Sequence, residues 1–125
     1  MEISISKFSP WEGSLNIVMN EEEKVVTYNG SVTDFECDRF AFLVCSAVSG
    51  WPNELVNHDI LDGTTYRITI NSERGKREFV YKNQFPEDFY RIIYVIKEVE
   101  KSVKKEQPEP TDKDIQDIID GLFSF

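Results

Sequence analysis

Alternating apolar and polar residues in the first thirty positions predict three β-strands. The segments are EISIS (residues 2–6), SLNIVMN (14–20) and VVTY (25–28). In the first two, the residues expected to face inward are Ile3, Ile5, Leu15, Ile17 and Met19. Turn-forming residues separate the segments, and the dipeptide Asn29–Gly30 ends the third. This order is typical of an antiparallel meander.

The pattern then changes to helical spacing. Thr33 and Glu36 form a capping-box pair, and Gly50 is a natural helix stop. The apolar residues between them are Phe35, Phe40, Leu43, Val44 and Ala47, widened by Cys37, Phe42 and Cys45. We therefore expect a largely buried helix between Thr33 and Gly50.

A second strand pair and a long helix follow. Tyr66, Ile68, Ile70, Phe79 and Tyr81 alternate with polar residues on either side of the turn SERGK (72–76). Pro86 suits a first helical turn. Beyond it, Phe89, Ile92, Ile93, Ile96, Val99 and Val103 recur every three or four residues. The order β-β-β-α-β-β-α predicts an α+β domain over residues 1–105, with an antiparallel sheet and two main helices on one face.

The C-terminal region differs from the rest of the chain in composition and in its predicted structure. Residues 106–113 are charged and contain prolines, which indicates an extended linker. Residues 114–125 predict a short amphipathic helix with an apolar stripe of Ile115, Ile118, Ile119 and Leu122. The stripe has two readings: it folds back onto the domain, or it enters a groove of a partner.

The net charge of −9 is unevenly distributed. Residues 1–62 contain 11 acidic and 3 basic residues, 63–105 contain 6 and 10, and 106–125 contain 6 and 1. Arginines and lysines gather at the 67–77 hairpin and along the long helix, but pairing with acidic neighbours explains them better than phosphate contacts do. Because an acidic protein is repelled by nucleic acid and by anionic membranes, we expect neither as a partner.

Several features indicate a cytoplasmic protein. The N-terminal residues lack a signal-peptide pattern, and no apolar run is long enough to cross a membrane. Cys37 and Cys45 fall in one predicted helix, roughly 12 Å apart along its axis, which is too far for a disulfide. Free thiols suit a reducing compartment.

Catalytic and metal-binding patterns are weak. The only histidine, His58, stands beside Asp59, and the two cysteines lie in the most apolar predicted helix. This set does not supply a closed zinc site, and no Gly-rich phosphate loop is present. We expect no metal, no cofactor and no enzymatic activity, although a hydrolase using His58 and Asp59 stays an alternative.

Acidic clusters are the better candidates for a binding site. Glu21, Glu22 and Glu23 share one predicted turn, and Asp112, Asp114, Asp117 and Asp120 mark the polar side of the terminal helix. Complementary charge speeds encounter with a basic partner. Trp11 and Trp51 stand in loop-like segments beside prolines, either as core plugs or as interface anchors, and Trp51 is included among the candidate contacts.

The stretch Asp62–Phe89, which reads DG-T-x-Y-x-I-x-I … N-x-x-P-x-x-F, resembles small acidic immunity proteins of bacterial toxin–immunity systems of the contact-dependent inhibition type. The resemblance implies an α+β cytoplasmic protein that binds a toxin, often a nuclease with a basic surface, and blocks it. We expect a non-enzymatic immunity or inhibitor protein, present as a monomer or weak homodimer. The alternative is a structural or regulatory module of a bacterial cytosol that self-associates through the terminal helix and a free sheet edge.

Overall fold

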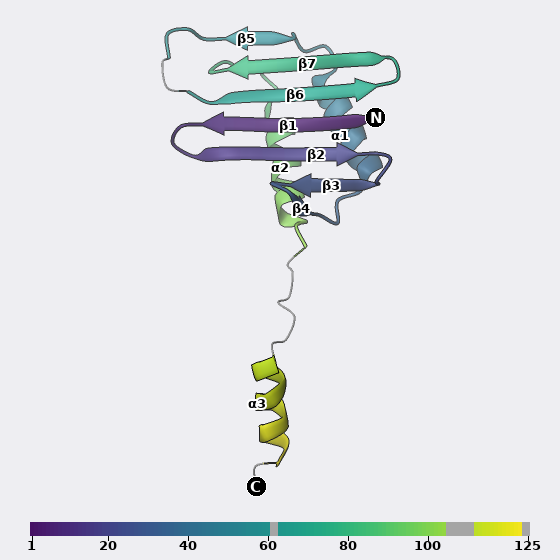
Figure 1. The fold of residues 1–125 in the computed structure, drawn as a ribbon. Helices are drawn as coiled ribbons and strands as arrows, with labels where there is room; N and C mark the ends of the chain where they lie inside the picture. Colours follow the sequence, from purple (N-terminus) through teal and green to yellow (C-terminus); the bar gives the residue numbers. More distant parts are fainter. Residues whose placement is uncertain (61–62, 105–111, 124–125) are drawn as a thin grey trace.

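The protein was analysed as a computed structural model, which describes residues 1–60, 63–104 and 112–123. A single sheet with two helices against one face forms the body of the molecule (Figure 1). The strands are β1 (Glu2–Ser9), β2 (Gly13–Asn20), β3 (Val25–Tyr28), β4 (Ser31–Val32), β5 (Glu54–Val56), β6 (Thr65–Ser72) and β7 (Gly75–Lys82). The helices are α1 (Cys37–Val48), α2 (Tyr90–Lys101) and α3 (Asp112–Phe123).

The strand order across the sheet is β4-β3-β2-β1-β6-β7-β5. All neighbouring strands are antiparallel except β5 and β7, which run parallel. The sheet is therefore mixed and not wholly antiparallel as the sequence predicted, because the short β5 was not foreseen. The N-terminal strand β1 lies at the centre, paired with β2 on one side and with β6 on the other. The predicted α+β class, with its two main helices on one face, is confirmed.

Alternation along each strand separates a buried face from an uncovered one. The strand residues that face α1 and α2 in the core include Ile3, Ile5, Leu15, Ile17, Met19, Val26, Ile68, Phe79 and Tyr81. The helices contribute Phe40, Val44, Ile92, Val95 and Val99 to the same core. Residues of the opposite parity, such as Ser4, Asn16 and Arg67, point to the uncovered face.

Helix α1 begins later than the capping box predicted. Its N-cap is Glu36, which makes no capping hydrogen bond with its side chain. The Thr33 hydroxyl instead donates to the Val26 carbonyl at 2.8 Å and accepts from the Phe35 amide at 3.3 Å. Thr33 therefore ties the entry segment to β3 and lets Phe35 enter the core. Phe42, expected to be buried, is 70% exposed because it lies on the solvent side of α1.

Two short strands and the start of α2 also differ from the prediction. The pair Asn29–Gly30, with φ of 48° and 83°, turns the chain from β3 into the two-residue β4. The three-residue β5 adds the parallel edge beside β7. Pro86 precedes α2, and its carbonyl accepts the Phe89 amide in a turn before the helix begins at Tyr90.

The terminal helix α3 covers Asp112–Phe123, two residues earlier than predicted at both ends. Its described side chains, including the apolar ones, are exposed. Residues 105–111, which hold most of the predicted linker, lie outside the described residues. Across the described part of the chain, no helix is long and apolar enough to span a membrane.

Candidate functional site

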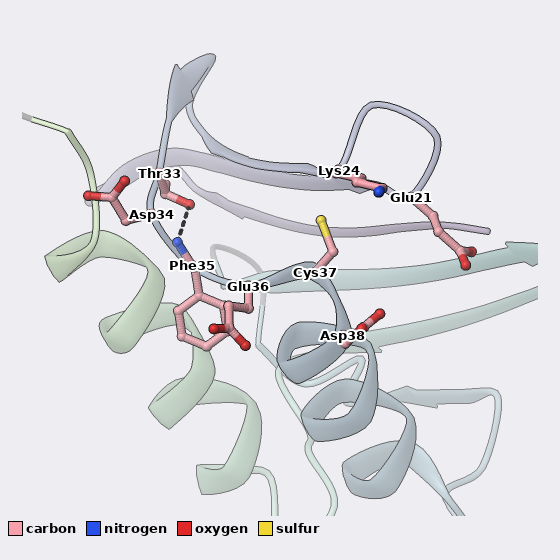
Figure 2. A pocket seen from close by; sticks show the side chains of 8 residues that line it. All are labelled: Glu21, Lys24, Thr33, Asp34, Phe35, Glu36, Cys37 and Asp38. Atoms are coloured by element: carbon pink, nitrogen blue, oxygen red, sulfur yellow. Dashed lines mark hydrogen bonds between the residues drawn. The ribbon is translucent and has the colours of Figure 1, made fainter.

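A groove of about 490 Å³ lies between the β2–β3 turn and the N-terminus of α1 (Figure 2). Its lining is rich in carboxylates and consists of Glu21, Lys24, Thr33, Asp34, Phe35, Glu36, Cys37 and Asp38. We call it the acidic groove. Two segments separated in sequence meet here, because β3 and β4 return the chain from the β2–β3 turn to the start of α1.

Local hydrogen bonds shape the β2–β3 turn. The side-chain oxygen of Asn20 accepts the Glu23 amide at 3.1 Å, and the Lys24 amide donates to the Glu21 carbonyl at 3.2 Å. Lys24 adopts a left-handed conformation with φ of 53°. The three consecutive glutamates thus lie on a closed turn whose backbone is ordered without help from their side chains.

The chain's first residue neutralises part of this turn. The Met1 α-ammonium lies 3.0 Å from Glu21 Oε2, and the Glu21 amide donates to the Met1 carbonyl at 3.2 Å. The hydrogen bond to Glu21 raises the pKa of the α-ammonium, with smaller contributions from the charges of Glu22 and Glu73. The negative charge of Glu21 is therefore partly neutralised, whereas Glu22 and Glu23 keep theirs.

The second wall is the segment leading into α1. The Asp34 amide donates to the Ser102 carbonyl at 2.9 Å, and the Asp34 carboxylate lies 3.4 Å from Lys104 Nζ. These contacts attach the segment to the end of α2. Asp38 lies in the first turn of α1, where the helix dipole stabilises a negative charge.

Four exposed carboxylates at this end form no ion pair with the described part of the chain. They are Glu22, Glu23, Glu36 and Asp38. Among the described residues of the groove lining, Lys24 is the one basic side chain. Such an arrangement attracts lysine and arginine side chains, and ordered backbone on both walls limits the entropy lost on binding.

The structure places the predicted site residues in different environments. It brings Glu21 together with Asp34, Glu36 and Asp38. Of these three, only Glu36 was singled out from the sequence, as part of a capping box. On α3, Asp117 and Asp120 are exposed, and Asp120 accepts a hydrogen bond from Gln116 at 2.9 Å. The side chains of Asp112 and Asp114 lie outside the described residues.

Trp51 is not available as a surface anchor. It is 8% exposed, packs against Tyr81 and Phe89, and donates its indole N–H to Asp88 at 2.7 Å. Of the two roles that the sequence suggested for Trp51, core plug or interface anchor, the structure shows the core plug. Trp11, in the β1–β2 turn, is 80% exposed. Its exposure could not be predicted from the sequence, because Trp11 lies outside every periodic segment.

Groups with catalytic chemistry are poorly placed for it. Burial raises the pKa of both the Cys37 and the Cys45 thiols, which disfavours the reactive thiolate. His58 and Asp59 are exposed in the turn after β5, where the Asp59 amide donates to Asn57. Among the described residues, no three histidine, cysteine or acidic side chains are grouped so that they could hold a metal ion.

No protein-family model matches the chain, and no match was found among curated proteins or solved structures. Function has to be inferred from the geometry of the molecule itself.

Proposed function

We propose that this protein is a non-enzymatic binding protein of the immunity or inhibitor type. It captures a basic protein, such as a toxin nuclease domain, through the acidic groove and the neighbouring β2–β3 turn. It acts in the cytoplasm of a bacterial cell, a reducing compartment that suits its two free thiols.

The acidic groove carries this proposal. Its walls come from two segments and are held by hydrogen bonds to the backbone. Among the lining carboxylates, Glu36 and Asp38 form no ion pair with the described residues, whereas Glu21 pairs with the Met1 α-ammonium and Asp34 with Lys104. Solubility alone explains scattered surface acids, but here Asp34, Glu36 and Asp38 line the same concave surface as Glu21 of the β2–β3 turn. Charges concentrated around a concave surface create a focused field that steers a basic ligand.

A protein partner fits this surface better than a small cation or a nucleic acid. The groove has a volume of about 490 Å³ and four carboxylates in its lining, so it matches lysine and arginine side chains on a folded surface. Two arginines of the β6–β7 hairpin are engaged within the molecule: Arg67 lies 3.1 Å from Glu78, and Arg77 stacks on Phe79 while donating to Asn53. These contacts support a structural role for the basic hairpin.

The absence of enzymatic activity is part of the proposal. The raised thiol pKa values and the exposed, separate position of His58 support it. Blocking a basic active site needs only affinity and shape. The sequence resemblance to immunity proteins is consistent with such a role.

Charge reversal in the groove tests the function. The probe is the protein encoded beside this gene, and its affinity is measured by calorimetry at low salt. Glu36→Lys should weaken binding at least tenfold, because it replaces an attraction by a repulsion. Glu87→Lys, an equally exposed reversal in the turn before α2, should leave affinity within twofold. A neighbouring protein that does not bind, or equal affinities for the two variants, would refute the proposal.

A self-associating module is the second candidate, favoured by the exposed apolar stripe of α3. The sheet edges are less suited to this role than the sequence suggested. Both edge strands, β4 and β5, are two and three residues long, and short edges resist pairing with another chain. Light scattering over a concentration series tests this candidate, and a monomer at every concentration would eliminate it.

A further inference from the structure

A second groove, of about 320 Å³, lies between α1 and α2, and none of the described residues that line it comes from the sheet. Leu43, Ala47, Tyr90, Tyr94 and Val95 supply most of its lining, with Ser46 and Arg91 at its rim. Nearby, Phe42 also projects into solvent. We call this the helix groove. Apolar side chains gathered in a concave surface mark a docking site for another apolar surface.

The same chain carries an apolar surface without a partner. On α3, the exposed residues Ile115, Ile118, Ile119 and Leu122 follow helical spacing and form one stripe. Lys113, Gln116, Asp117 and Asp120 occupy the other side. The shape of this helix matches the helix-in-groove mode of recognition, in which residues three and four apart enter an apolar groove.

We infer that α3 docks into the helix groove of its own chain. Helix α2 is 12 residues long, about 18 Å, and the chain leaves it beside Val103, which forms a bridge to Thr33. Residues 104–111 span up to about 27 Å when extended. This length lets α3 run back antiparallel to α2, as in an α-hairpin, and reach Tyr94 and Tyr90.

Charge favours this occupant. The solvent sides of α1 and α2 carry the bases Arg39, Arg91, Lys97 and Lys101 and the acids Asp38, Glu98 and Glu100. The polar side of α3 carries Asp117 and Asp120 against the single Lys113. The excess of one base on α1 and α2 and the excess of one acid on α3 give a modest attraction, and the apolar stripe supplies the burial.

The tether favours the same chain over a second copy. Only a few residues separate α2 from α3, and a short covalent connection corresponds to an effective concentration of about the millimolar range. The α3 helix of a second copy, present at micromolar concentration, is therefore a weak competitor for the helix groove. Docking is independent of the acidic groove, so its test does not depend on the proposed function.

Engineered cysteine pairs test the inference in the full chain. In a background of Cys37→Ser and Cys45→Ser, the pair Tyr94→Cys with Ile118→Cys joins the groove to the stripe. The control pair, Lys82→Cys with Ile118→Cys, joins the uncovered face of the sheet to α3. Under mild oxidation at micromolar concentration, the first pair should form an intramolecular disulfide at least tenfold faster than the control.

A matched pair of variants then separates docking from chance collision. Ile119→Asp places a charge on the stripe and should slow formation of the Tyr94–Ile118 cross-link to the rate of the control pair. Gln116→Asp adds the same charge on the polar side and should leave it within twofold. Both residues are exposed, so neither substitution endangers the fold. Disulfides only between chains, or equal rates for the two pairs, would overturn the inference.

Discussion

The indole Nε1 of Trp51 donates a hydrogen bond of 2.7 Å to Oδ1 of Asp88. This contact connects the loop after α1 to the turn before α2, across a separation of 37 residues. The Trp51 ring lies within 6 Å of the ring centroids of both Tyr81 and Phe89. One side chain therefore fastens both helix connections to β7.

Substitutions at Trp51 should lower the stability of the protein, and the larger the part of the side chain removed, the greater the loss should be. Trp51→Phe keeps an aromatic ring but removes the donor to a charged acceptor, so the free energy of unfolding should fall by about 2 kcal/mol. Trp51→Ala also leaves a cavity and should cost about 3–5 kcal/mol. Urea denaturation measures both. Trp11→Ala is the control and should change stability by no more than about 0.5 kcal/mol, since Trp11 is exposed.

Tyr81 should make stability fall at alkaline pH. Burial raises the pKa of its phenol to about 12, and its hydroxyl donates to the Pro52 carbonyl at 2.6 Å. In the unfolded chain the phenol ionises near pH 10. Above that pH the unfolded state loses the proton while the folded state keeps it, so stability decreases. Urea denaturation should show full stability below pH 10 and a progressive loss between pH 10 and 12.

Tyr81→Phe provides the control for this pH dependence. The variant should be less stable at pH 8, by about 1 kcal/mol, because the Pro52 carbonyl loses its donor. It should also lose less stability above pH 10 than the parent protein does. Parallel pH profiles for the two proteins would contradict the assignment to Tyr81.

The cysteine thiols should react slowly with alkylating reagents. Burial raises the pKa of both Cys37 and Cys45, so less thiolate is present at pH 8 than in an exposed thiol. Iodoacetamide labelling of the folded protein should be at least several-fold slower than labelling of the same chain in urea. A thiol that reacts faster when folded would reveal an activated nucleophile and would reopen the question of catalysis.

Much of the sheet follows from alternation alone. Ile3 and Ile5, Ile17 and Met19, and Phe79 and Tyr81 alternate so regularly that a register shift by one residue would expose them. The buried side of α2 was predictable for the same reason, because Ile92, Ile96 and Val99 keep the helical period.

Other features have no periodic signal. Strands β4 and β5 are shorter than one full alternation, and only pairing with β3 and β7 makes them strands. Phe42 looked buried because apolar residues surround it in sequence, yet α1 offers only one side to the sheet. The acidic groove depends on a tertiary return of the chain, so the sequence predicted Glu21–Glu23 as a candidate but not that Glu21 shares a groove with Glu36 and Asp38.

The central claim is that the acidic groove captures a basic protein. Its most direct test is the association rate with the protein encoded beside this gene, measured by stopped-flow fluorescence at several ionic strengths. Steering by unpaired carboxylates predicts a rate that falls at least tenfold between about 50 and 500 mM salt, and Asp38→Lys should lower the low-salt rate and flatten that dependence. An association rate indifferent to salt and to Asp38→Lys would contradict the account.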